Sequence, residues 1–325
     1  MLLRGFSKAI SETADFLSDR VAEIALFFLT LFIVSCASAP NLNNIPGYEE
    51  GSGLLSILPY GAKVYFWTDV AKGRPILDKI SPLYFSGNDV SRILDNTNSA
   101  VAAIFPEGQS RRFFLGGLIA YTSSKVNFSL SLSKDWKKQK SATGNNYWYS
   151  SKENLSLALV SNIALVSDTD PFSYYQNEIP PEGFMEFREG MVMAGWMPNP
   201  NEPINGFLEK FGIPLEIPAE DFLFGVTKTE ANLWELVFKI KTQSPAQARS
   251  LLSVFNMARF FLQKGGSQSA NQNGLEENFI SPEEAVSLLF ARAPEQDGLY
   301  LTLRTAPLNE SRLALLFTMF KIYSN

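Results

Sequence analysis

An uncharged apolar run of eleven residues, from Ile24 to Val34, constrains this chain more than any other feature of its sequence. A helix that crosses a bilayer needs about 20 apolar residues, and Asp19, Arg20 and Glu23 prevent the run from extending upstream. A run of this length is typical of the apolar core of an export signal peptide. The sequence therefore predicts a segment that is removed after export rather than a membrane-spanning helix.

The residues at the end of this run, Ile33-Val34-Ser35-Cys36, resemble the bacterial lipobox, in which branched, small or apolar residues precede a cysteine. The resemblance implies that residues 1–35 are a signal peptide, cleaved between Ser35 and Cys36, and that the Cys36 thiol carries diacylglycerol, with palmitate-like acyl chains. Two or three such chains, at about 0.8 kcal/mol per buried methylene, give a stable membrane anchor. A secretory signal with an incidental cysteine and an apolar core helix remain as alternatives.

Residues 36–57 are rich in Gly, Pro, Ser and Asn and lack a sustained hydrophobic period. Such a composition predicts a flexible tether behind the lipidated cysteine. Ala37 stands where some enteric lipoproteins carry an inner-membrane retention aspartate. We therefore expect a protein anchored in the cell envelope, facing the periplasm or the cell surface, with the outer membrane slightly favoured.

The composition excludes several classes of chemistry. The chain has no histidine, which removes Ser-His-Asp and Cys-His catalysis and imidazole-ligated metals. Cys36 is the only cysteine, so neither an internal disulfide nor a thiolate cluster can form. With 28 basic and 33 acidic residues, the chain lacks the basic footprint of a nucleic-acid-binding protein. We expect no cofactor, no metal site and no nucleic-acid partner.

The region 58–178 shows alternating strand and helix signals. A β-branched and aromatic strand is predicted at 62–70, helical spacing at 76–80 and again at 90–94, and paired strands at 100–105 and 113–121. Segment 124–140 fits a strand or a helix, and we interpret it as a helix. Further strands are predicted at 147–149, 155–160 and 163–166.

The region 179–325 follows the break at Pro180-Pro181, and its predicted strands and helices come in an order similar to that of region 58–178. Its predicted elements are a strand at 191–197, a short helix at 203–211, a hairpin over 222–229 and 233–242, a helix from Ser244-Pro245, a helix from Ser281, a strand near 299–303 and a buried helix or strand at 312–323.

Two passes through the same order of elements predict an α+β protein with two similar domains, 58–178 and 179–325, each a mainly antiparallel sheet with helices on one face. This order, with Trp136 and then Tyr147-Trp148-Tyr149 beyond it, resembles an uncharacterised class of duplicated-domain bacterial surface lipoproteins that includes proteins of spirochaetes. The resemblance covers residues 58–323 and implies no established activity.

The one basic cluster consists of Lys134, Lys137, Lys138 and Lys140 around Trp136. It suits contact with anionic headgroups or with a polyanionic partner, with the tryptophan at the interface. The simpler interpretation, which we favour, is the exposed end of a helix.

Two patterns keep a hydrolase as an alternative. Ser131-Leu132-Ser133-Lys134 matches the S-x-x-K pattern of penicillin-recognising enzymes, but their S-D-N and K-T-G companions are absent from the sequence. Carboxylates are frequent, and two distant ones suffice for glycoside hydrolysis, yet no pair stands out. Asp168 and Asp170 could bind a hard cation, although solvation of the turn before Pro171 is the expected role.

Taken together, these features predict a non-enzymatic envelope lipoprotein that acts as a binding or scaffolding module for an envelope protein. The alternatives are a carrier of a lipid or other apolar ligand, favoured by an aromatic content of 13%, and a hydrolase with a Ser/Lys or paired-carboxylate site.

Overall fold

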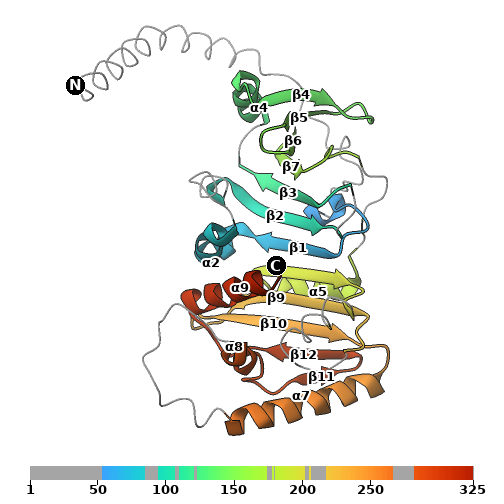
Figure 1. Ribbon diagram of the computed structural model, residues 1–325, viewed down its shortest axis with the longest axis vertical. Coiled ribbons are helices and arrows are strands. Elements are labelled where there is room, and N and C mark those ends of the chain that lie inside the picture. The colour runs from blue at the N-terminus through green and yellow to red at the C-terminus, as the bar shows by residue number, and fades with distance from the viewer. Residues whose placement is uncertain are drawn as a thin grey trace, which may run out of the picture. The chain divides into compact units, whose positions relative to one another are not determined.

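The computed structural model describes residues 53–84, 94–106, 110–120, 123–173, 178, 180–201, 205, 217–265 and 282–324 (Figure 1). The chain divides into two units, Met1–Asn41 and Leu42–Asn325, and every described residue belongs to the second. The predicted signal peptide, the lipobox and most of the predicted tether lie outside the described residues, as do most of the helices predicted at 90–94 and 203–211.

The described strands form a single antiparallel sheet of 12 strands, in the order β11-β12-β10-β9-β8-β1-β2-β3-β7-β6-β5-β4 (Figure 1). They are β1 (Val64–Asp69), β2 (Thr97–Ile104), β3 (Phe113–Ile119), β4 (Trp136–Lys140), β5 (Asn146–Ser150), β6 (Leu155–Val160), β7 (Ile163–Ser167), β8 (Met193–Pro198), β9 (Asp221–Lys228), β10 (Trp234–Lys241), β11 (Glu295–Asp297) and β12 (Tyr300–Arg304).

The two predicted halves meet where β1 pairs with β8, and Tyr65 lies opposite Trp196 in this ladder. We expected two sheets, one for 58–178 and one for 179–325, and the structure has one continuous sheet instead. The physical reason is that both strands present large apolar side chains, which pairing at this seam buries. The similarity of the two halves remains a prediction.

The helices connect and cover these strands. They are the 3₁₀ helix η2 (Gly53–Ile57) and the α-helices α2 (Val70–Tyr84), α4 (Ser123–Leu132), α5 (Glu182–Glu189), α7 (Pro245–Gly265), α8 (Pro282–Leu289) and α9 (Glu310–Ser324). The prediction of an α+β fold with a mainly antiparallel sheet is confirmed.

Two local predictions were wrong. Segment 124–140 is not one helix, because α4 ends at Leu132 and the chain continues as β4. The tether does not extend to residue 57, because Gly53–Ile57 forms η2 and buries Leu54, Leu55 and Ile57 in the core. The sequence interpretation also missed helix α5 and strand β11.

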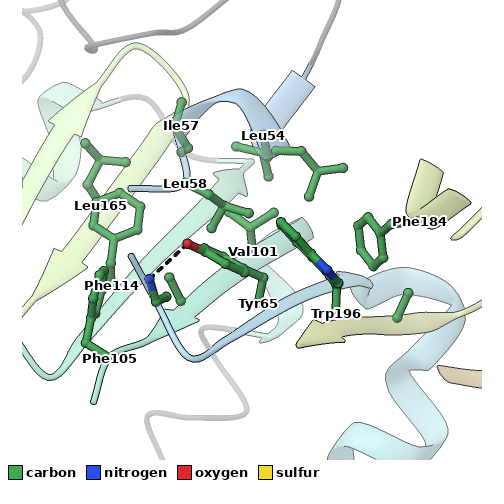
Figure 2. Packing of buried hydrophobic residues seen from close by; sticks show 14 of the residues in the cluster. Leu54, Ile57, Leu58, Tyr65, Val101, Phe105, Phe114, Leu165, Phe184 and Trp196 are labelled. Carbon is green, nitrogen blue, oxygen red and sulfur yellow. Dashed lines mark hydrogen bonds between the residues drawn. The ribbon is translucent and has the colours of Figure 1, made fainter. Parts of the chain in front are cut away.

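Side chains alternate between the two faces of the sheet. On the first face, Tyr65, Phe114, Leu165 and Trp196 pack with residues of η2 and α5 in the largest buried cluster (Figure 2). On the second face, residues of α2 and α9 pack over β8 to β10 in a second cluster. Residues of α7 form a third cluster with β10 and β12. The first and second clusters place β8, β9 and β10 between buried side chains on both faces.

Candidate functional site

The predicted lipidation residues, Ile33, Val34, Ser35 and Cys36, lie outside the described residues. The first described element after them is η2, which begins at Gly53 and is held by the buried Leu55 and Ile57. Across the described residues, no helix is long and apolar enough to cross a membrane.

The basic cluster lies at one end of the sheet rather than on a helix. Lys134 is in the loop after α4, and Trp136, Lys137 and Lys138 belong to β4 (Figure 1). Helix α4 ends because the Ser133 N–H donates to the Leu130 carbonyl and the Ser133 hydroxyl then accepts from the Asp135 N–H. The expectation that these lysines decorate a helix end is therefore corrected.

A tight turn makes β4 one arm of a hairpin. The Ser141 N–H donates to the Asn145 carbonyl at 2.8 Å, and the Gly144 N–H donates back to the Ser141 carbonyl at 2.9 Å. Gly144 has a φ of 87°, which glycine adopts without strain. The Thr143-Gly144-Asn145 sequence is a turn signal that could have revealed this hairpin from the sequence.

The two faces of β4 carry different contacts. On the first face, the Tyr147 hydroxyl donates to the Gln139 side chain at 2.9 Å, and burial, together with the charge of Asp170, raises the pKa of the Tyr147 phenol. On the second face, the Trp148 indole N–H donates to Asn127 of α4 at 2.7 Å. These bonds hold β5 against β4 and α4. They do not involve the lysine side chains of β4, which are exposed to solvent.

The four lysines of the basic cluster lack an ion-pair partner among the described residues. Lys134, Lys137, Lys138 and Lys140 are exposed, and no ion pair with another described residue involves them. The nearby Asp135 pairs with Lys152 instead, at 3.7 Å. Leu132, at the end of α4, has 70% of its surface exposed. We call Lys134 and strand β4 the basic edge.

The S-x-x-K pair is not assembled as a catalytic pair. The Ser131 hydroxyl donates to the Phe128 carbonyl at 2.6 Å, and Lys134 follows the end of the helix, so the pair does not lie one helical turn apart on α4. A serine nucleophile needs its base within hydrogen-bonding reach. The structure therefore gives no support to a Ser/Lys site at this position.

Asp168 and Asp170 cap a loop. Asp168 accepts hydrogen bonds from the Arg112 and Phe113 backbone N–H groups and forms an ion pair with the Arg112 side chain at 3.0 Å. Asp170 accepts from the Phe172 N–H. Among the described residues, no three Asp, Glu or Cys side chains gather as a metal-binding group.

Sequence reasoning missed an apolar surface on the second face of β2, β3, β7 and β6. The registers align Ala102, Leu115, Val166 and Leu157 in one row across these strands, with Ile104 opposite Phe113 in the next row. The first face of these strands is buried, but Ile104 is 45% exposed and Leu115 37% exposed. We call these six residues the apolar face.

The composition of the apolar face is unusual for a sheet face that is in contact with water. An antiparallel sheet with one face in water normally carries polar residues on that face. Helix α2 packs against β1 and β2, and α4 packs against β4 and β6. The uncharged residues of the apolar face extend from β2, which α2 contacts, across β3 and β7 to β6, which α4 contacts. Contiguous exposed apolar patches, in contrast to single exposed residues, mark interaction sites, and Ile104 and Leu115 lie on adjacent paired strands.

Comparisons with known proteins define the class of fold. No protein-family model matches the chain, and no curated protein matches it in sequence. Among solved structures, the chain is similar to an α+β protein with the same arrangement of a large sheet and helices. That protein is TP0453 of the spirochaete Treponema pallidum.

In crystal form III of TP0453 the TM-score is 0.51 and the sequence identity 17%, over 82% of this chain and 97% of that chain. In crystal form I the TM-score is 0.50 and the identity 18%, over 82% and 96% of the two chains. At this identity, the likeness concerns the fold alone.

Proposed function

We propose that this protein is a cell-envelope lipoprotein, anchored by lipid on Cys36, whose sheet acts as a non-enzymatic binding or scaffolding module. The observation that carries the proposal is the lipobox-like Ile33-Val34-Ser35-Cys36 sequence, which combines the only cysteine with an apolar run of signal-peptide length. The described part is compatible with such an anchor, because its first element, η2, begins 17 residues after Cys36 and leads into the sheet.

The length of the linker sets how the folded part meets the membrane. A flexible chain of this length has an end-to-end distance of about 20–25 Å and a fully extended reach of about 60 Å. The lipid therefore keeps the sheet within a short distance of the headgroups. At such distances, a weak surface contact is strengthened by the high effective concentration.

Within this proposal, the basic edge is the first place to look for a contact. Lys134, Lys137 and Lys138 are exposed around the half-buried Trp136, and the exposed Leu132 lies close to them in sequence. Basic residues near a membrane surface contribute about 1 kcal/mol each when anionic lipids are present. We propose that this edge contacts headgroups or an envelope protein, on the periplasmic or cell-surface side of the outer membrane.

Membrane fractionation tests the anchor. The wild-type protein and Cys36→Ser are expressed in a bacterial host, and their distribution between membrane and soluble fractions is measured in high salt. We expect the wild-type protein to stay with the membrane and Cys36→Ser to accumulate as an unprocessed precursor. A serine variant that is processed and fractionated like the wild type would overturn the proposal. Cys36→Ala provides the matched control, because it removes the thiol and the hydroxyl alike.

A second candidate function, carriage of a lipid or another apolar ligand, is favoured by the apolar face. Ile104 and Leu115 are more than a third exposed, which makes this face accessible to an alkyl chain. Binding of a fluorescent fatty acid should fall at least tenfold in Leu115→Lys. It should be unchanged in Leu132→Lys, which places the same charge at an exposed leucine elsewhere. If Leu115→Lys and Leu132→Lys bind the fatty acid equally well, the apolar face is not the ligand site.

A further inference from the structure

The outer side of β4 has hydrogen-bonding groups that the sheet leaves unused. Hydrogen-bonded and non-hydrogen-bonded pairs alternate along an antiparallel ladder. The Ser141–Asn145 pair is hydrogen-bonded, so Gln139/Tyr147 and Lys137/Tyr149 are the hydrogen-bonded pairs of β4 and β5. The N–H and C=O groups of Trp136, Lys138 and Lys140 therefore point away from β5.

No other described strand uses these groups, because β4 is the last strand of the sheet order. Helix α4 contacts the hairpin on its second face, where Asn127 accepts from Trp148. Short edge strands with lysines are a common defence against sheet-to-sheet aggregation. The same lysines also discriminate between partners, since they repel a second copy of β4 and attract an acidic strand.

We propose that β4 binds an extended acidic segment of a partner protein, which adds to the sheet as a further strand beside β4. Backbone hydrogen bonds to Trp136, Lys138 and Lys140 supply the affinity, as in other cases of strand addition. Carboxylates on alternate residues of the partner lie beside Lys138 and Lys140, whose side chains share the second face. This inference names the partner class for the basic edge and rests on the proposed binding-module function.

An extended peptide accounts for more of the observed features than a lipid headgroup. A headgroup would engage the four lysine charges but would leave the outward backbone groups of β4 to water. Their regular spacing matches that of a strand, with one outward residue in two. The sharpest test therefore separates the backbone contribution from the charge.

The experiment uses the lipidated protein in neutral detergent micelles and a labelled eight-residue peptide that alternates glutamate and threonine. Binding is followed by fluorescence anisotropy for the wild type, Lys138→Gln and Lys138→Pro. The glutamine variant removes one charge and keeps the outward N–H. The proline variant removes both, and proline is tolerated on an edge strand because the lost N–H faces away from β5. Lys79→Gln, on α2, is the control for a charge removed elsewhere.

We expect Lys138→Gln to weaken binding by about threefold to tenfold, a change of about 1 kcal/mol, and Lys138→Pro to weaken it at least tenfold further. Lys79→Gln should bind like the wild type. Equal binding by the proline and glutamine variants would overturn the proposal. If Lys138→Pro does not fold, the wild-type protein is tested with a peptide N-methylated on alternate residues. Binding must be lost when the methylated residues are those whose N–H groups face β4. It must be retained when the methylated residues are those whose N–H groups face away from β4.

Vesicles with and without anionic lipid distinguish the other source of negative charge. If anionic vesicles bind the protein through Lys138 and the acidic peptide does not, the partner inference is wrong and the basic edge is a headgroup contact. That result leaves the proposed lipoprotein function standing, because lipid attachment at Cys36 is measured independently by fractionation.

Discussion

Tyr65 and Trp196 stack across the β1–β8 ladder with ring centroids 5.0 Å apart and planes at 20°. Both residues are almost fully buried, and Phe184 of α5 packs beside the indole at 6.3 Å (Figure 2). The stack lies at the seam where the two halves of the chain join one sheet. The stability of the two halves should therefore be coupled through this pair.

Replacement of Trp196 by alanine should destabilise the whole sheet. Removal of a buried tryptophan leaves a large cavity and costs about 3–5 kcal/mol. Because β1 and β8 belong to one sheet, urea unfolding should remain a single transition when followed by fluorescence and by hydrogen exchange in both halves. Trp136→Ala, at a half-buried position on the edge strand β4, should lower the free energy of unfolding much less than Trp196→Ala does. Two separate transitions in the wild type would show that the halves fold independently.

Replacement of Tyr65 by phenylalanine tests a buried hydroxyl. The Tyr65 oxygen accepts from the Ala62 N–H at 2.9 Å, and its hydroxyl hydrogen can bond to Glu178 at 2.9 Å. Its loss leaves a buried N–H without a partner and should cost about 1–3 kcal/mol. Denaturant titration at neutral pH measures this loss. An unchanged midpoint would show that water replaces the hydroxyl.

The same residue predicts an alkaline dependence of stability. Burial, and then Glu178, raise the pKa of the Tyr65 phenol above its ordinary value. In the unfolded chain this phenol loses its proton near pH 10, whereas in the folded protein it keeps it. Its contribution to stability is therefore complete below about pH 10 and falls as the pH rises further. The free energy of unfolding of Tyr65→Phe should decline less steeply over this range, and equal slopes for the two proteins would contradict the prediction.

Two glycines form a matched pair for a packing test. A Cβ added to Gly195 in β8 would overlap the Phe224 ring, whereas one added to Gly190 would meet nothing within 4 Å. Phe224 is fixed between Phe66 at 5.4 Å and Phe222 at 5.7 Å, so the ring has little freedom to move. Gly195→Ala should destabilise the protein by about 1–3 kcal/mol, measured by thermal unfolding. Gly190→Ala should leave the midpoint nearly unchanged, and similar shifts for both variants would refute the packing argument.

Elements with strong local signals were predictable from the sequence. The stripe that includes Leu251 and Phe255 predicts α7, and both side chains are buried in the structure. The hairpin of β9 and β10 follows from two apolar runs around a short turn. The strands β2 and β3, with their intervening Pro-Glu-Gly, were equally clear.

Long-range pairing was not predictable in the same way. Nothing near Tyr65 or Trp196 in the sequence shows that two strands about 130 residues apart are neighbours in one sheet. At the basic edge, the sequence identified Lys134, Trp136, Lys137 and Lys138, but it did not show that three of them form an edge strand. Residues 136–140 form a strand because they pair with β5. Their own sequence has only a weak alternation of polar and apolar residues.

The apolar face was hidden for a related reason. Strands β2, β3 and β7 are apolar on both faces, a pattern that is typical of strands buried on both sides. The sequence therefore did not distinguish the buried face of these strands from the face on which Ile104 and Leu115 are exposed. Which face a helix covers depends on where α2 and α4 pack, and no local pattern encodes that placement.

The central claim, a lipid anchor on Cys36, is tested most directly by the intact mass of the protein purified from membranes. The account predicts a chain that begins at Cys36 and is heavier than residues 36–325 by a diacylglycerol group and, in hosts that acylate the new amino terminus, one further acyl chain. A mass that includes residues 1–35, or an unmodified thiol at Cys36, would contradict it.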